Sequence, residues 1–310
     1  MSSARLIQLT KVLRDPRILL SRIVMLEAVS KRLSDVTYLK WVYYLRTGKY
    51  LDLEHPKTFN EKIQWLKLHN TSDECTRSVD KYEVRQLIAE KIGEEYLIPM
   101  VGCWESFDEI HFDTLPDQFV LKCTHDSGSV VICRDKCTFN KEAAKAKLEA
   151  AMKHNFFWTG REYPYKNVKP RIICEQLMKD SKSDDLVDYK FFCFGGQPKI
   201  LFYASDRFNK KKEPTKFDFY DMNLERLDIS RPGHGHADTP LNEIPKFSEM
   251  KDIATKLSSG YPFVRIDLYL INDKIFFGEY TFHPSGGYVK FAPDVWDTTF
   301  GEWIKLPTDK

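Results

Sequence analysis

The chain has 310 residues, of which 42% are hydrophobic and 14% aromatic, and its formal net charge is +2. This amount of apolar material excludes a wholly disordered chain, and the near-neutral charge gives no indication of a nucleic-acid partner. The sequence contains no run of about 20 apolar residues, the length that spans a bilayer, and no secretory signal. We therefore expect a cytoplasmic protein of one or two domains, or one domain of several lobes.

The cysteines also favour a reducing compartment. There are seven, an odd number, and no CxxC pair occurs among them. Several stand in apolar runs, which is typical of buried free thiols. Cys133 and Cys137 are spaced to share a metal, but no second pair completes a zinc site.

Apolar residues recur at helical spacing over residues 4–50, with a break at Pro16. Six Lys or Arg residues lie between Arg5 and Lys31. One interpretation is a helix packed on the body of the protein with a solvated basic face. The other is an amphipathic helix that makes peripheral contact with an anionic inner-membrane surface.

The middle of the chain alternates between helix and strand signals. Asp80 is suited to cap a helix over the residues that follow it. Two strands are expected at residues 119–123 and 130–133, on either side of a polar loop. Residues 141–153 are rich in Ala, Lys and Glu and predict another helix.

Strand signals dominate the last part of the chain. One hairpin is expected over residues 189–203, with its turn at Gly195 and Gly196, and another over residues 263–282. Residues 230–239 between them predict a flexible connection, whose two histidines are exposed or meet an acceptor or a metal. Separate helices and hairpins indicate the α+β class.

Two carboxylates mark the last hairpin. If its turn holds three residues, 272–274, Asp267 lies directly opposite Glu279, with Cβ atoms about 4.5–5.5 Å apart. Such a pair destabilises a sheet unless a cation lies between the two charges, and it suits Mg²⁺. A two-residue turn would put the two side chains on opposite faces. The alternative to a metal pair is that one side chain reaches solvent at a sheet edge.

Lys122 stands inside the apolar strand 119–123, where an unpaired ammonium is costly, so an anionic partner is expected. The loop that follows contains Gly128 between Ser127 and Ser129, small residues that let backbone N–H groups approach phosphate oxygens. This signal is weaker than a P-loop, and an ordinary hairpin whose lysine reaches solvent is the alternative.

Further charged residues accompany the strands that follow. Glu175 comes directly after an apolar run, and Asp188 and Lys190 begin the next strand. Asp188 is suited to ribose hydroxyls and Lys190 to a phosphate. The alternative is a surface ion pair worth less than about 1 kcal/mol.

The order of these features resembles the ATP-grasp superfamily. The order begins with a strand that contains a lysine, a loop of small residues, a strand that ends in Glu and a strand that begins with Asp-x-Lys. The motif Arg-x-Asp follows at Arg265 and Asp267, and the motif Glu-x-Thr-x-x-Pro-x-Gly then runs from Glu279 to Gly286. A closer resemblance is to the TupA-like ATP-grasp family of bacterial polysaccharide and teichuronopeptide clusters. Its character appears in residues 58–65, 80–85, 119–122, 125–128, 188–191 and 279–281.

This resemblance implies an ATP-grasp fold, in which two α+β lobes sandwich a nucleotide. We expect an N-terminal helical extension at residues 1–55. A first lobe with the phosphate loop and adenine hinge is expected at residues 56–183, and a second lobe with the metal site at residues 184–310.

The resemblance also assigns roles toward ATP and Mg²⁺. The implied nucleotide-binding residues are Lys81, Lys122, Ser127, Gly128, Ser129, Glu175, Gln176, Met178, Asp188 and Lys190. The implied metal ligands are Asp267, Glu279 and Thr281. Thr281 replaces the Asn of the superfamily and is a weaker ligand, which puts a second metal position in doubt. The implied catalytic residues are Arg265, Lys190 and His125.

The family implies a ligase in which a carboxylate attacks the γ-phosphate of ATP and an amine then displaces phosphate from the acyl phosphate. The implied substrates are an amino acid or amine and a uronic-acid sugar of a bacterial surface polysaccharide. One alternative is a glycosyltransferase that uses a nucleotide sugar and a divalent metal. Another is a non-catalytic ATP-binding module at the membrane.

Overall fold

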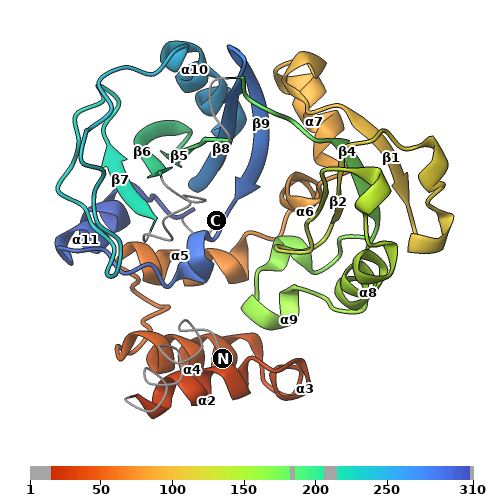
Figure 1. Ribbon diagram of the computed structural model, residues 1–310. Helices are drawn as coiled ribbons and strands as arrows, with labels where there is room; N and C mark the ends of the chain where they lie inside the picture. The colour runs from red at the N-terminus through yellow and green to blue at the C-terminus, as the bar shows by residue number, and fades with distance from the viewer. Residues whose placement is uncertain (1–14, 182–185, 206–214, 308–310) are drawn as a thin grey trace.

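The computed structural model describes residues 15–181, 186–205 and 215–307. It contains α-helices and two antiparallel sheets, so the α+β class is confirmed (Figure 1). No helix among these residues is long and apolar enough to span a membrane. Residues 4–14 of the predicted helical run lie outside the described residues.

The N-terminal part forms a small helical unit with a hydrophobic core of its own. Its helices are α2 (Pro16–Val24), α3 (Glu27–Ser30) and α4 (Asp35–Thr47). Asp15 caps α2 by accepting a hydrogen bond from the Arg17 amide at 3.0 Å. Pro16 therefore begins a helix at the position that tolerates proline best, instead of only interrupting one.

The outer side of α2 is apolar and basic. Leu19, Leu20 and Ile23 are 48%, 49% and 44% exposed, and Arg17 and Arg22 are exposed beside them. The unit is fixed to the rest of the chain elsewhere, through the buried Arg161. This guanidinium donates hydrogen bonds to the carbonyl oxygens of Ser30 at 2.6 Å and of Leu33 at 3.2 Å.

The first sheet has the strand order β1-β4-β2-β3, with all neighbours antiparallel. Its strands are β1 (Met100–Trp104), β2 (Phe119–Cys123), β3 (Val131–Cys133) and β4 (Ile172–Gln176). Helix α8 (Lys141–Met152) covers this sheet through Ala144 and Leu148. The predicted helix over 141–153 and the two predicted strands are confirmed.

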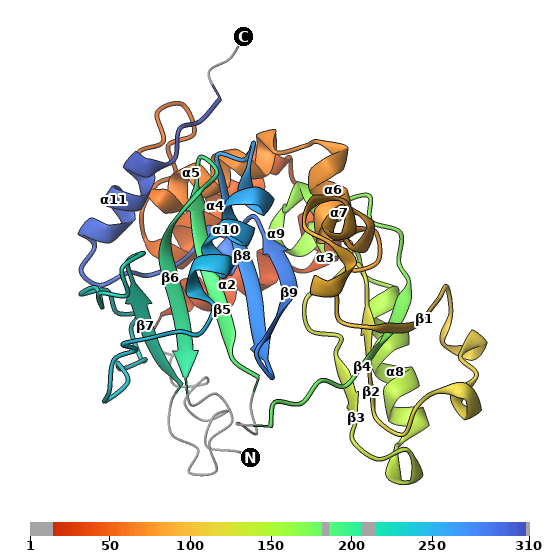
Figure 2. The ribbon, with the colours of Figure 1, turned by 90° about the horizontal axis from the view of Figure 1, so that it is seen from above.

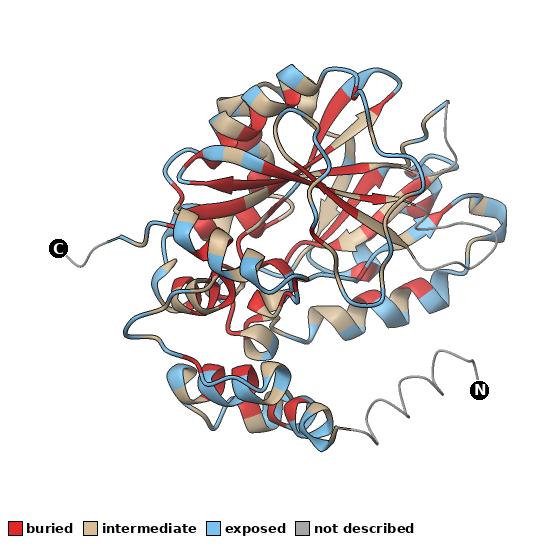
Figure 3. Cartoon of the chain, turned by 90° about the vertical axis from the view of Figure 1, so that its left-hand side faces the viewer, coloured by how far each residue is buried: buried red, intermediate tan, exposed pale blue. Residues whose placement is uncertain are grey.

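The second sheet has the strand order β7-β6-β5-β8-β9. Its strands are β5 (Asp188–Phe194), β6 (Gln197–Ser205), β7 (Lys216–Tyr220), β8 (Phe263–Ile271) and β9 (Lys274–Thr281). The hairpin β5–β6 turns at Gly195 and Gly196, whose φ angles of 57° and 81° glycine adopts without strain. Figure 3 shows that buried residues are concentrated along the strands.

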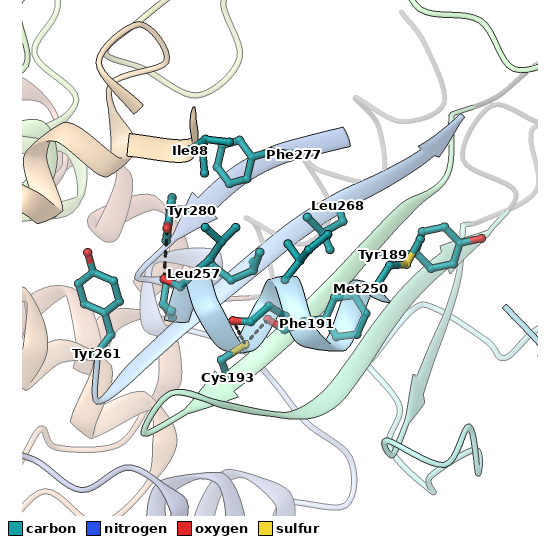
Figure 4. Close-up of a cluster of buried hydrophobic side chains, with 14 of the residues drawn as sticks. Ile88, Tyr189, Phe191, Cys193, Met250, Leu257, Tyr261, Leu268, Phe277 and Tyr280 are labelled. Atoms are coloured by element: carbon teal, nitrogen blue, oxygen red, sulfur yellow. Dashed lines mark hydrogen bonds between the residues drawn. The ribbon is translucent and has the colours of Figure 1, made fainter. Parts of the chain in front are cut away.

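Helix α10 (Phe247–Ser258) covers one face of the second sheet. Met250 and Leu257 pack there against Phe191, Cys193 and Leu268 (Figure 4). The shorter helices α6 (Asp73–Val79) and α7 (Val84–Lys91) add to the same core beside β9. Asp80 does not cap α7 directly, because α7 begins at Val84; its carboxylate instead accepts hydrogen bonds from the amides of the turn before it.

The other face of the second sheet is covered by α5 (Phe59–His69) and α11 (Val295–Trp303). Thr58 and Glu61 form a reciprocal capping box at the start of α5. Phe59 lies 5.0 Å from Phe263 and 6.0 Å from Phe300, measured between ring centroids. Helix α5, which stands in the range expected for the first lobe, thus packs on the second sheet.

The two sheets lie side by side, with the β9 edge of the second facing the first (Figure 2). Short segments complete the described chain: helix α9 (Phe157–Gly160) and 3₁₀ turns at Glu94–Tyr96, Phe107–Glu109, Phe112–Thr114, Lys136–Thr138, Tyr163–Tyr165 and Pro284–Gly287. The cysteines of the described chain are free, and most are buried, as predicted.

Candidate functional site

A cavity of about 430 Å³ lies between the two sheets. Its walls come from β2 and β4 on one side and from β5, β8 and β9 on the other, with α6 and α7 at one end. Nine of the predicted site residues line it: Lys81, Lys122, Glu175, Gln176, Met178, Asp188, Lys190, Asp267 and Glu279.

The turn between β8 and β9 differs from the prediction. It holds two residues, Asn272 and Asp273, both with positive φ, and Ile271 pairs with Lys274. Such a turn alone would place Glu279 on the face opposite Asp267. A β-bulge at Gly278 adds one residue to β9 and restores the pairing, so Asp267 lies directly opposite Glu279.

A row of charge crosses the second sheet at this register. Lys190 of β5 pairs with Asp267 of β8, which pairs with Glu279 of β9. The Lys190 Nζ lies 2.5 Å from Asp267 Oδ2 and 3.2 Å from Asp188 Oδ2. The lysine therefore holds two carboxylates of neighbouring strands together.

Arg265 connects the two carboxylates of the row. Its Nε and NH2 atoms lie 2.6 and 2.7 Å from the two oxygens of Asp267, and NH2 lies 2.9 Å from Glu279 Oε1. Burial alone would raise the pKa of Asp267, but Arg265 and Lys190 hold that pKa below its ordinary value. Asp267 is therefore ionised at neutral pH and already oriented.

Asp267 and Glu279 fit a metal ion whose remaining ligands come from a bound substrate and water. Asp267 is buried, whereas the Glu279 side chain is 52% exposed. Across the described chain, no group of three or more His, Cys, Asp or Glu side chains is placed to hold a metal ion. Two carboxylates suffice for Mg²⁺ when substrate phosphates and water supply the remaining oxygens.

Thr281, the third predicted ligand, is engaged with the pair. Its hydroxyl donates to Glu279 Oε1 at 2.9 Å and accepts from Arg265 NH2 at 3.0 Å. This arrangement orients Glu279 and leaves the hydroxyl little freedom to bind a cation. We infer that Thr281 positions the site without being one of its main ligands.

The opposite wall carries two lysines. Lys122 Nζ lies 2.6 Å from Glu175 Oε2, and Arg85 NH1 lies 3.6 Å from Glu175 Oε1. Lys81 donates a hydrogen bond to the backbone oxygen of Asp126. Burial and the nearby Lys122 lower the pKa of Lys81. Positive charge is thus incompletely neutralised on this wall, which fits a polyphosphate.

The predicted adenine hinge lies at the end of β4. The carboxylate of Glu175 is held by Lys122, and the amide of Gln176 donates to the oxygen of Pro99 at 3.0 Å. Neither group is therefore free in this arrangement to bind a base. Met178 and the apolar Val120 line the same end of the cavity, which suits a flat aromatic ring.

Parts of the predicted phosphate loop point elsewhere. His125 is 2% exposed and its Nε2 lies 3.2 Å from the oxygen of Ala151, outside the lining of the cavity. The Ser129 hydroxyl accepts from the Cys123 amide at 3.0 Å and donates to Asp126 at 2.6 Å. The structure does not bring these two side chains into the site, because both stabilise the loop itself.

The tip of the same loop is open. Ser127 and Gly128 are exposed, and Gly128 has a φ of 119° with no atom within 4 Å of the position a Cβ would take. This part of the loop retains the freedom that a phosphate-covering role requires.

The profile of the TupA-like ATPgrasp family matches residues 61–305 of the sequence. The chain belongs to the TupA-like ATP-grasp family. No curated protein sequence matches it. The family model begins after the N-terminal helices, which therefore lie outside the shared region.

Solved ATP-grasp structures resemble the chain distantly. One is the ligase PsnB complexed with minimal precursor, with 10% identity and a TM-score of 0.37, over 68% of this chain and 55% of that one. Another is the D-alanine–D-alanine ligase of Bacillus anthracis complexed with ATP (13% identity, TM-score 0.38, 66% and 54%). The Helicobacter pylori D-alanine–D-alanine ligase gives 15% identity and a TM-score of 0.37, over 80% and 69%. The chain spans little more than half the length of the first two.

Tyr165 of this ATP-grasp chain lies at the candidate site, although no sequence pattern predicted it. It lines the cavity. Burial raises its pKa well above the ordinary value, and the negative charges of Glu162 and Glu279 raise it further. It lies in a 3₁₀ turn between helices and strands, where no periodicity or charge pattern marks it.

The segment 230–239 makes hydrogen bonds and stacking contacts with the rest of the TupA-like fold, contrary to the prediction of a flexible connection. Ser230 pairs with Ala292 through two backbone hydrogen bonds of 2.8 and 2.9 Å. His234 stacks on Phe217 with 3.8 Å between ring centroids, and His236 Nδ1 lies 3.0 Å from Asp218 Oδ1. Both histidines therefore have partners within the chain.

Proposed function

We propose that the cavity binds Mg-ATP and that the protein is an ATP-dependent carboxylate–amine ligase acting through an acyl phosphate. The observation that carries this proposal is the opposition of charge across the cavity. Asp267 and Glu279 of the second sheet line the cavity together with Lys122 of the first sheet and Lys81 of the turn between α6 and α7. A metal polyphosphate is complementary to such a site, because the carboxylates bind the cation and the ammonium groups bind the phosphates.

The residues of the site divide the work. Lys81 and Lys122 bind and orient the phosphates, and Asp267 and Glu279 hold Mg²⁺. When bound, Mg-ATP supplies the phosphoryl group that a substrate carboxylate accepts before an amine displaces phosphate. Arg265 stabilises the negative charge that develops during both transfers. The loop around Gly128 covers the site and excludes water from the acyl phosphate.

The substrates that we propose are an amino acid or amine and a uronic-acid sugar of a bacterial surface polysaccharide. What supports this proposal is membership of the TupA-like ATP-grasp family, whose profile matches residues 61–305. The cavity of about 430 Å³ accommodates a nucleotide, so the two substrates would enter beside it.

Nucleotide choice distinguishes the ligase from a glycosyltransferase. We expect Mg-ATP to raise the melting temperature of the full chain, whereas UDP- and GDP-sugars with the same metal leave it unchanged. A pooled screen of amino acids and uronic acids for ADP release, followed by mass analysis, then identifies the product. Stabilisation by a nucleotide sugar and not by ATP would contradict the ligase, and ATP binding without ADP release under any acceptor would favour a binding module.

We further propose that the N-terminal helical unit contacts an anionic membrane surface. Exposed leucine and isoleucine side chains of α2 lie among exposed arginines, and α2 itself contains no acidic residue. The preceding residues 1–14 contribute Arg5, Lys11 and Arg14 and no Asp or Glu. This combination of apolar and cationic groups is complementary to anionic lipid.

A further inference from the structure

The face of the second sheet that bears the charged row also bears an arginine from outside the sheet. Side chains alternate between faces along a strand, so Lys190, Arg265 and Glu279 share one face with Phe202 and Phe217. The guanidinium of Arg231 lies 5.4 Å from the centroid of the Phe217 ring. Arg231 therefore lies over the same face as the metal-binding pair.

Arg231 is held there by both of its neighbouring segments. The pairing of Ser230 with Ala292 fixes its backbone. Its NH2 atom donates to Ser285 Oγ at 3.3 Å. Ser285 lies in the turn that directly follows β9, whereas Phe217 belongs to β7 at the other edge of the sheet. The guanidinium therefore lies between a ring of β7 and the turn that follows β9.

Among the described residues, no carboxylate neutralises the positive charge of Arg231. Its guanidinium has five N–H donors, and Ser285 is the hydrogen-bond partner that the described residues provide, with no carboxylate among them. By contrast, Arg265 is paired with two carboxylates, those of Asp267 and Glu279. Burial and the charge of Arg265 lower the pKa of Arg231. An arginine that is half-buried beside another arginine requires an anion.

The position of this charge separates it from the nucleotide. Asp267 and Glu279 line the cavity, but neither Arg231 nor Ser285 does. Arg265 contacts both carboxylates, and its charge also acts on Arg231. The anion that Arg231 requires therefore binds beyond the metal pair, where the acceptor of the phosphoryl group has to lie.

We propose that Arg231 and Ser285 form the subsite for the substrate carboxylate that accepts the phosphoryl group. This inference rests on the proposed function. One carboxylate oxygen uses a lone pair to form a bond to the γ-phosphorus, and the bond from that phosphorus to the β–γ bridging oxygen breaks, so that ADP leaves with the electron pair. The other oxygen stays on the guanidinium, whose planar fork matches a carboxylate. The ligand class is a small carboxylic acid.

The test uses calorimetric titration of D-glucuronate and L-glutamate into the full chain saturated with Mg-ADP. We expect the wild type to bind at least one of the two acids. Arg231→Ala should weaken that binding about tenfold or more, as the loss of a charge-assisted hydrogen bond predicts. Arg231→Lys should recover part of it, and the affinity for Mg-ADP should stay within about twofold in both variants.

Arg226→Ala is the matched control. Arg226 donates to the Ala237 oxygen at 2.9 Å and lies 3.7 Å from Asp218, so it anchors the same segment without facing the charged row. The inference would be overturned if Arg231→Ala bound the acid as the wild type does, or if Arg226→Ala weakened acid binding equally. It would also be overturned if the wild type loaded with Mg-ADP bound neither acid. Failure of the wild type to bind Mg-ADP would instead overturn the proposed function on which it rests.

Discussion

Asp267 and Glu279 face each other across β8 and β9 because β9 carries one extra residue, Gly278, between Glu279 and the two-residue turn. The bulge corrects the register that the turn would impose and brings both carboxylates to the cavity. Bulges next to active sites commonly have this effect of redirecting a side chain. The proposed metal site thus depends on a residue with no side chain.

Gly278→Ala tests that dependence. A Cβ at this position would lie 2.9 Å from the backbone carbonyl oxygen of Asp267 and 3.1 Å from Cε2 of Tyr269. We expect a loss of about 1–3 kcal/mol in the free energy of unfolding in urea, together with weaker Mg²⁺-dependent ATP binding, because the bulge has to shift. Gly235→Ala is the control, since its Cβ would make only ordinary contacts of 3.7 Å or more. Equal stability and equal ATP affinity in the two variants would rule out the role of the bulge.

Lys122→Met tests the phosphate wall. The substitution keeps the apolar stem and removes the ammonium that lies 2.6 Å from Glu175. We expect calorimetry to show ATP affinity about tenfold lower or more, because a charge-assisted contact to phosphate is lost. Lys153→Met, at an exposed position after α8, should bind ATP as the wild type does. Unchanged affinity in Lys122→Met would remove this lysine from the site.

The buried Lys67 predicts how stability changes with pH. Burial lowers its pKa from 10.5 to about 8, while its Nζ donates to the Gly286 oxygen at 2.8 Å. Between these two pKa values the unfolded chain binds more protons, so the contribution of Lys67 to stability rises with pH and is least favourable below pH 8.

Lys67→Met isolates this contribution. The wild type should gain about 2–3 kcal/mol relative to the variant between pH 7 and pH 10, measured by urea unfolding. Lys40→Met, at an exposed position of α4, controls for the loss of one charge. A difference between wild type and Lys67→Met that stays constant over this range would show that Lys67 does not titrate there.

The proposed membrane contact is tested by sedimentation with lipid vesicles. The full chain should sediment with vesicles that contain phosphatidylglycerol and not with pure phosphatidylcholine, and salt should weaken the binding. Leu20→Asp combined with Ile23→Asp should abolish it. Val36→Asp replaces an apolar side chain of α4 that is 43% exposed and serves as the control. Binding to neither vesicle, or an equal loss in the control, would exclude α2 as the contact.

The sequence predicted the elements whose signals are local. The helix α8 and the hairpins of the second sheet follow from composition, alternation and turn glycines, and the ordered motifs indicated which strands carry the charged side chains. The exact turn of the last hairpin was not predictable, because Asn272-Asp273-Lys274 is compatible with a turn of two or three residues and a bulge leaves no pattern around Gly278.

Side-chain direction and long-range packing were the other limits. His125 and Ser129 lie in the predicted loop but turn inward, His125 toward the Ala151 carbonyl of α8 and Ser129 toward the Cys123 amide of β2. The packing of α5 on the second sheet and the position of Arg231 over its face arise from tertiary contacts. No spacing rule in the sequence encodes either of them.

Calorimetric titration of ATP, with and without Mg²⁺, into the wild type, Glu279→Gln and Glu302→Gln tests the central claim most directly. Glu302 is an exposed residue of α11 that does not line the cavity, and it controls for the loss of a carboxylate. We expect Mg²⁺-dependent binding of one ATP in the wild type and in Glu302→Gln. Glu279→Gln should keep its fold but lose the Mg²⁺-dependence and the formation of ADP. Binding that is indifferent to Mg²⁺ in the wild type, or a Glu279→Gln variant that binds and turns over ATP normally, would contradict the assignment of Asp267 and Glu279 as the metal pair.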